Sequence, residues 1–279
     1  MTEEGSGDSA RLVLQRHRLR PRKSLGQNFL RDRRYLAAIV DALDLSAEDE
    51  VLEIGPGTGV LTARLTSLAH RVVAVELDPY LATALRAEFP SSPNLEIVAG
   101  DALKFHPAHH FDGTYKLAGN IPYYITGPLL RHYLELPRPP AVMALMVQKE
   151  VAERIVAEPG NLSLLGVSVQ FHGHPSIVAR VPRRAFHPVP KVDSAVLRIV
   201  PHEPPLPPDL RPEFFRLVRA GFGTKRKTLR NALAIGLDLH AVEAEALLAR
   251  ASIDSRRRAE TLRVEDWVRL TLTFRGRND

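Results

Sequence analysis

Hydrophobic and polar positions alternate between two periods along residues 33–200. Within 33–44 the apolar residues recur every three or four positions, which predicts a helix that Asp32 would cap. Further helices are expected over 59–69, 79–89, 127–136 and 149–158, and strands over 51–55, 71–77, 95–100, 115–120, 141–148, 177–182 and 194–200. Alternation of this kind predicts βαβ units and a parallel sheet, in which the last two strands could also run antiparallel.

A proline-rich stretch, residues 201–212, interrupts this alternation, and beyond it the pattern is helical only. Helices are expected over 212–222, 226–235 and 241–250 and around Trp267. The chain is therefore predicted to contain an α/β domain, a stiff linker and a small all-helical domain. The domains are expected to comprise residues 20–200 and 213–279, with the linker at 201–212 and a disordered or flexible tail at 1–19.

Composition excludes several classes of site and location. The 279 residues include no cysteine, which excludes disulfides, thiolate nucleophiles and zinc–sulfur sites. No stretch has the roughly 18 apolar residues of a membrane span, and the polar start lacks the apolar segment of a signal peptide, so a cytoplasmic protein is expected. His109 and His110 lack the spacing of helical metal ligands, and no metal is expected.

The positive charge is clustered along the chain. Net charge is +6, with nine Lys and Arg between residues 11 and 34, seven between 211 and 230, and three in succession at 256–258. Clustered basic charge predicts a polyanionic partner such as nucleic acid. A solvated basic surface is the alternative.

A glycine-rich segment follows the first predicted strand. In EIGPGTG, residues 53–59, glycines stand at every second position, where they allow a tight turn and close approach of a ligand. Glu76 ends the second strand and Asp101 follows the third. Together, a glycine-rich turn and two carboxylates at neighbouring strand ends predict a site for an adenosine. A nicotinamide dinucleotide and S-adenosylmethionine both fit, although the glycine spacing differs from the dinucleotide fingerprint.

The stretch LAGNIPYYITGPLL, residues 117–130, is apolar except where Asn120 and Pro122 end the fourth strand. The Asn120 side-chain oxygen and the Ile121 carbonyl could both accept from one exocyclic amino group, and Tyr123 could stack on the base that carries it. Two such acceptors would stabilise positive charge developing on adenine N6. This chemistry favours S-adenosylmethionine. The alternative is a kinked strand with core tyrosines.

Several sequence motifs, in order along the chain, resemble those of a known family. NIPY resembles the N-x-P-Y motif of S-adenosylmethionine-dependent N6-adenine methyltransferases. With KSLGQNFL, EIGPGTG, GDAL, LMVQKEVAERI and FHPVPKVDS, the chain from about Arg20 to Trp267 resembles the ribosomal RNA adenine N6,N6-dimethyltransferase family, above all its bacterial small-subunit members. The resemblance implies a Rossmann-like methyltransferase sheet with a small helical RNA-binding domain.

The resemblance also implies a reaction and partners. Methyl groups would pass from S-adenosylmethionine to N6 of two adjacent adenosines near the 3′ end of small-subunit (16S) rRNA. The partners would be this RNA and the immature small ribosomal subunit, with a role in its biogenesis, and the protein would be a monomer. Open alternatives are a large-subunit rRNA methyltransferase of the antibiotic-resistance type, a non-catalytic assembly factor and a DNA-binding factor. Intact NIPY and cofactor motifs favour retained catalysis.

Roles for single residues follow from the same resemblance. Around the cofactor, Asn28 and Leu30 would close over its methionine part, Gly55 would lie beneath it, Glu76 would hold the ribose and Asp101 the adenine end. Asn120 would stand at the point of methyl transfer, with Tyr123 and Phe186 on the two faces of the target adenine. Ile121 replaces a common leucine and Tyr124 occupies a variable position, both mild departures.

Four cations are candidates for phosphate contacts in the helical domain: Lys225, Arg226, Lys227 and Arg230. They are expected at the beginning of a helix, where positive charge opposes the helix dipole. A phosphate backbone would explain their position. An exposed basic turn without a partner is the alternative.

Overall fold

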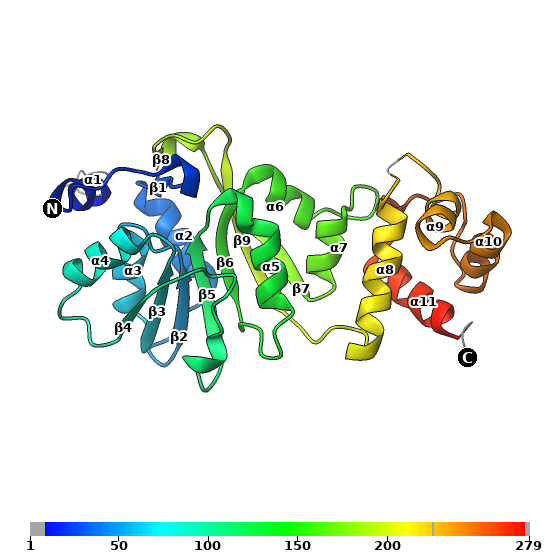
Figure 1. Cartoon of the computed structure of the whole chain (residues 1–279), viewed down its shortest axis with the longest axis horizontal. Coiled ribbons are helices and arrows are strands. Elements are labelled where there is room, and N and C mark those ends of the chain that lie inside the picture. Colours follow the sequence, from blue (N-terminus) through cyan, green and yellow to red (C-terminus); the bar gives the residue numbers. More distant parts are fainter. Residues whose placement is uncertain (1–8, 225, 277–279) are drawn as a thin grey trace. The chain divides into compact units, whose positions relative to one another are not determined.

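The computed structural model describes residues 9–224 and 226–276, which form two compact units. The first comprises the described residues up to 152 together with 175–201, and the second comprises 153–174 with the described residues from 202 onward (Figure 1). Because the chain passes between the units three times, the boundary runs through α6 (Lys149–Ile155) and β7 (Gly173–Val181).

The first unit is built on a mixed sheet with helices on both sides (Figure 1). Its strands are β2 (Glu50–Ile54), β3 (Arg71–Glu76), β4 (Leu95–Ala99), β5 (Tyr115–Asn120), β6 (Met143–Gln148), β7 and β9 (Ser194–Pro201). The order is β4-β3-β2-β5-β6-β9-β7, with parallel pairing from β4 to β6 and antiparallel pairing of β6 with β9. This confirms the predicted Rossmann-like α/β fold class. β2 lies between β3 and β5, so the carboxyl ends of these three strands share one edge.

The helices of the first unit are α1 (Ser9–Arg16), α2 (Arg33–Leu43), α3 (Val60–Thr66), α4 (Pro79–Glu88) and α5 (Thr126–Leu134). Asp32 caps α2 as predicted, because its side chain accepts from the Arg34 N–H. The apolar face of α2, with Leu36, Ile39 and Leu43, joins a buried cluster that includes α3 and one face of the sheet. Helical periodicity and strand patterning thus meet in one core.

Helix α1 differs from the flexible tail expected over residues 1–19. Residues 1–8 lie outside the described part of the chain, whereas 9–16 are helical. Ala10 and Leu14, four residues apart, bury one helix face in a cluster with Phe29 and Leu81. Arg16 also bonds both oxygens of Glu88, at 2.8 and 2.7 Å. The polar beginning of the chain conceals this short amphipathic segment.

The second unit is helical: it contains α7 (Leu164–Gln170), α8 (Arg211–Phe222), α9 (Leu229–Leu237), α10 (Ala241–Arg250) and α11 (Val264–Arg275). Its core includes Trp267 and the stacked rings of Phe171 and Phe214, whose centroids are 4.1 Å apart. Phe171 belongs to 153–174, so the unit boundaries differ from the predicted 20–200 and 213–279. The proline-rich stretch, predicted to be a stiff linker, contributes buried Leu206 and Leu210 to this core.

Short elements complete the chain: β1 (Phe29–Leu30), β8 (Phe186–His187) and the 3₁₀ turns η1 (Lys23–Leu25), η2 (Pro107–His109), η3 (Tyr123–Ile125), η4 (Arg183–Ala185), η5 (Pro208–Leu210) and η6 (Ala259–Thr261). β1 and β8 pair antiparallel, with Leu30 opposite Phe186. Over the residues that the structure describes, we find no helix with the length and apolar character needed to span a bilayer.

Candidate cofactor and substrate site

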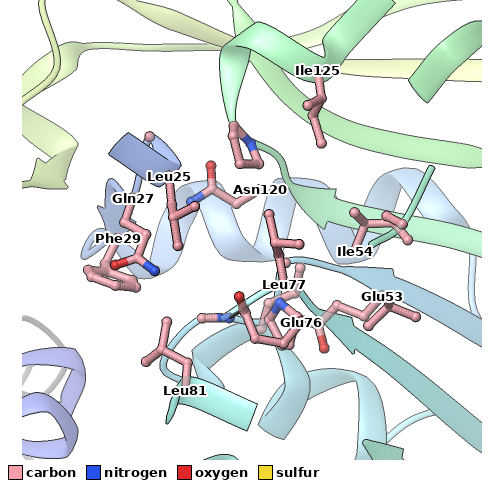
Figure 2. A pocket seen from close by; sticks show the side chains of 18 of the residues that line it. Leu25, Gln27, Phe29, Glu53, Ile54, Glu76, Leu77, Leu81, Asn120 and Ile125 are labelled. Atoms are coloured by element: carbon pink, nitrogen blue, oxygen red, sulfur yellow. Dashed lines mark hydrogen bonds between the residues drawn. The ribbon is translucent and has the colours of Figure 1, made fainter. Parts of the chain in front are cut away.

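A pocket lies at the carboxyl ends of β2, β3 and β5, and it encloses about 1160 Å³ including its open mouth. All six residues predicted to hold the cofactor line it: Asn28, Leu30, Gly55, Glu76, Asp101 and Asn120. Figure 2 shows Gln27 and Phe29 on one side of the pocket, across from Glu76 and Leu81. Segments far apart in the sequence therefore meet in this pocket.

The glycine-rich turn between β2 and α3 forms the floor of the pocket. Gly57 and Gly59 have φ angles of +60° and +82°, which side chains other than glycine rarely adopt. A Cβ atom at Gly59 would lie 2.6 Å from the Phe89 ring, and one at Gly57 would lie 3.0 Å from Phe29. Glycine is therefore required at both positions, because a side chain would be strained at these φ angles and would clash with Phe29 or Phe89.

Glu76 is fixed by the backbone at the end of β3. Its Oε2 accepts from the Gly57 N–H at 3.0 Å and its Oε1 from the Asp78 N–H at 2.9 Å. The residue is only 6% exposed, and burial raises the pKa of its carboxyl, while the two N–H donors lower it. Each oxygen retains a lone pair, so the carboxylate can accept two further bonds from a ligand.

Asp101 lies in the loop that follows β4, the strand that pairs with β3. Its Oδ1 accepts from the Leu103 N–H at 2.9 Å, which fixes the side chain toward the pocket that it lines. Glu76 and Asp101 thus present acceptor oxygens from two neighbouring strand ends. Such an arrangement suits a ligand with hydroxyl and amino donors along one side, as in an adenosine.

Asn120 ends β5 directly beside the turn that follows β2. Its Nδ2 donates to the Asn28 carbonyl oxygen at 2.9 Å, so residues 92 positions apart are joined within the pocket. Because a carbonyl can only accept, the amide nitrogen of Asn120 must face Asn28. Oδ1 then points away from Asn28 and remains available as an acceptor. The side chain is partly buried, which limits competition from water.

Tyr123 and Tyr124 follow in η3 and differ in setting. The Tyr123 hydroxyl is 2.7 Å from the Ser194 hydroxyl oxygen, and burial raises the pKa of this phenol, so it is neutral at physiological pH. Tyr123 is not among the residues that line the pocket. Tyr124 does line it and is 59% exposed.

Phe186 occupies a different place from the one expected. It is 1% exposed, pairs across from Leu30 in the small β1–β8 sheet and belongs to the core that includes α2. The structure therefore does not bring its ring to the pocket surface. The sequence pattern could not distinguish a core aromatic before two prolines from a stacking residue.

The predicted RNA-contacting cations lie in the second unit. Arg226 and Lys227 are exposed in the turn before α9, which begins at Leu229 rather than at 226, while Lys225 lies outside the described residues. Arg230, on α9 itself, has Nη1 3.4 Å from Glu245. Nearby acids also approach the consecutive arginines: Arg256–Asp254 at 3.0 Å, Arg257–Asp266 at 3.3 Å and Arg258–Glu260 at 3.9 Å.

Glu53 is a pocket residue whose burial the sequence did not reveal. It is 1% exposed, lines the pocket and has no hydrogen-bond partner for either carboxylate oxygen among the described residues. Burial raises its pKa to about 8, so the group is largely protonated at neutral pH. Its position as the one charged side chain between buried Leu52 and Ile54 was the available signal. In the described ranges, no cluster of three or more metal-ligating side chains occurs.

The chain is similar to ribosomal RNA methyltransferases over most of its length. The family model for ribosomal RNA adenine dimethylase matches residues 18–275. The protein named ribosomal RNA small subunit methyltransferase A from Dehalococcoides mccartyi is 47% identical over 268 residues, which cover 95% of this chain and 92% of that protein. The protein of the same name from Pelotomaculum thermopropionicum is 43% identical, with 95% of each chain covered.

Solved structures extend the likeness. A dimethyladenosine transferase from Plasmodium falciparum has a TM-score of 0.77 at 28% identity, covering 90% of this chain and 98% of that one. The 23S rRNA methyltransferase ErmE has a TM-score of 0.72 at 32% identity, covering 88% and 98%. Both relatives therefore share the fold over nearly the whole chain.

Proposed function

The chain belongs to the ribosomal RNA adenine dimethylase family, and we propose that it dimethylates N6 of two adjacent adenosines near the 3′ end of small-subunit rRNA. One observation carries the proposal: the six predicted cofactor residues line a single pocket, and one of them, Asn120, has its Oδ1 available as an acceptor there. The curated relatives named above act, by their names, on small-subunit ribosomal RNA.

S-adenosylmethionine fits the acceptor groups of this pocket. The remaining lone pairs of Glu76 would accept from ribose hydroxyls, and Asp101 would accept from the adenine amino group. Gly55 and Gly57, which carry no side chains, would lie beneath the cofactor, with Asn28 and Leu30 over it. When bound, the cofactor supplies an electrophilic methyl group.

The chain's own residues would then prepare the adenine amino group. Asn120 Oδ1 and the Ile121 carbonyl would accept from its two protons, which favours tetrahedral nitrogen and stabilises the developing charge. No strong base is needed for this step. Tyr123, held through Ser194, would stack on the base. Phe186 could reach the other face only after leaving its buried position.

RNA would be held by basic surface in the second unit, to which Arg226 and Lys227 contribute exposed positive charge. We propose that the immature small subunit is the form recognised, since ribosomal RNA is the family's substrate. We also propose that the enzyme is monomeric and cytoplasmic. A large-subunit substrate is the second candidate. Its support is the fold shared with ErmE, at lower identity than the small-subunit relatives.

The test is to incubate the protein with methyl-labelled S-adenosylmethionine and, separately, unmethylated small subunits, large subunits and naked RNA. We expect label on two adjacent adenosines of the small subunit, as dimethyladenosine, when modified bases are mapped. Label confined to the large subunit would support the second candidate. Binding of small subunits without transfer would instead indicate an assembly factor.

A further inference from the structure

Residues 22–30, here called the cover segment, form one side of the pocket and contact Asn120, the residue proposed to act at the point of methyl transfer. The segment comprises η1, a turn and β1, and its residues from 25 to 30 line the pocket. Gly26, at φ +64°, packs on Pro122 so closely that a Cβ there would lie 3.3 Å from the proline side chain. The cover segment is therefore fitted against the residues that follow Asn120.

Gln27 anchors the cover segment through both ends of its side-chain amide. Its Oε1 accepts from the Arg22 N–H at 2.8 Å, and its Nε2 donates to Asp78 Oδ2 at 3.2 Å. Arg22 Nε lies 3.5 Å from the same Asp78 oxygen. Asp78 is itself fixed, because it is 3% exposed and its Oδ1 accepts from the Tyr80 N–H at the beginning of α4. Gln27 thus ties a loop to a rigid, buried carboxylate, and Figure 2 shows it at the pocket.

The residue after Gln27 determines the orientation of the Asn120 amide. The Asn28 carbonyl accepts from Asn120 Nδ2 at 2.9 Å, which directs Oδ1 the other way. Asn28 supplies this contact through its backbone, so the contact depends on where the cover segment lies rather than on the Asn28 side chain. Any displacement of the segment would release the amide to rotate and to exchange its donor and acceptor ends.

We propose that Gln27 is a positioning residue for methyl transfer, acting through the Asn28 carbonyl on Asn120. The inference rests on the proposed function, which makes Asn120 Oδ1 the acceptor for the adenine amino group. Covering the cofactor and orienting the amide then become one event, because the same segment does both. Preorganised acceptors accelerate a reaction only while their orientation is maintained.

The kinetic test uses Gln27→Met, which keeps side-chain length and removes both hydrogen bonds. Single-turnover transfer on small subunits at saturating cofactor is expected to slow about 10-fold, while cofactor affinity by calorimetry changes less than about 3-fold. The matched control is Gln170→Met, because Gln170 Nε2 donates to the Ile155 and Ala157 carbonyls in the second unit. Its transfer rate should equal that of the wild type.

A double variant separates positioning from general damage. Added to Asn120→Ala, Gln27→Met should slow transfer no further, because the amide that it orients is already absent. Additive losses would overturn the proposal, and so would a Gln27→Met rate within about 2-fold of the wild type.

A second readout does not depend on activity. The Asn120 side-chain NH₂ resonances, assigned by their loss in Asn120→Ala, should exchange slowly with water in the wild type bound to S-adenosylhomocysteine and rapidly in Gln27→Met. In Asp78→Asn the single amide oxygen cannot serve both the Tyr80 N–H and Gln27 Nε2, which bond different oxygens of Asp78, so this variant should also exchange rapidly. An unchanged rate of exchange of the Asn120 NH₂ protons in Gln27→Met would overturn the proposal. If the wild type methylated no ribosomal particle, the proposed function would fail, and these resonances would still decide the role of Gln27.

Discussion

The cofactor pocket and the basic turn before α9 use charge in opposite ways. In the pocket, Glu76 is buried and both of its oxygens are held by backbone N–H groups. In the second unit, Arg226 and Lys227 are exposed, and Arg230 lies near an acid. A single buried and oriented group can contribute a large part of the binding energy, whereas exposed cations each contribute little and act through their number. Position along a strand therefore predicts the first kind of site better than counting charges predicts the second.

The largest effect is expected from Glu76→Ala. The substitution removes an acceptor at a buried site and leaves the Gly57 and Asp78 N–H groups unpaired. Affinity for S-adenosylmethionine should fall by about 2–4 kcal/mol, as measured by calorimetry. Glu76→Gln, which retains one oxygen, should lose less. Unchanged affinity in Glu76→Ala would remove this residue from the cofactor site.

The next effect should separate chemistry from binding. Asn120→Ala should slow single-turnover methyl transfer by about 10²-fold or more, because a preorganised acceptor is lost. Cofactor affinity should remain nearly the same, since the proposed contacts to ribose and adenine, Glu76 and Asp101, lie on β3 and after β4. Rapid transfer by this variant would exclude the proposed role of Asn120.

Glu53 makes the stability of the first unit dependent on pH. Its pKa is about 8 in the folded chain, against 4.5 when solvated, so the folded state binds a proton that the unfolded chain releases across this window. This group's contribution to stability should therefore fall as pH rises from about 4.5 to 8. Glu53→Gln should gain several degrees in Tm over the wild type at pH 8 and little at pH 5. Equal differences at both pH values would contradict the shift.

The smallest effects are expected at the basic surface. Replacing both Arg226 and Lys227 by Ala should lower the salt slope of log affinity for small subunits by about 1.4–1.8, the counterion release of two phosphates. Arg256 and Arg257 are the control, because each lies near an acid in the free protein. Their double alanine variant should change the slope less. An unchanged slope in the first variant would assign RNA binding to the basic residues between 11 and 34 instead.

Much of the pocket could be predicted because its chemistry follows directly from strand order. Glu76, Asp101 and Asn120 each stand at or after the carboxyl end of a parallel strand, and such ends gather at one edge. Gly57 and Gly59 were equally visible, since their spacing after β2 marks the turn. The family resemblance added Asn28 and Leu30, which no local pattern would have placed there.

What the sequence did not reveal depends on contacts between distant segments. Gln27 meets Asp78 across 51 positions, and the helical face of α1 becomes visible only through its partners Phe29 and Leu81. Phe186 is buried because β8 pairs with β1, an arrangement of two-residue strands with no periodicity to detect. In each case tertiary pairing, not local propensity, decides the outcome.

The composition of the second unit has a consequence for how the chain is made. Phe171 precedes its stacking partner Phe214 by 43 residues, and the strands β7 and β9 lie between them in the sequence. At ordinary rates of synthesis, 5–20 residues per second, that apolar ring waits roughly 2–9 s for its partner. A nascent chain halted after β9 would carry Leu162, Val167 and Phe171 without the core that buries them. The helical unit therefore cannot be translated as an independent appendage, because its first part is synthesised before the sheet is complete.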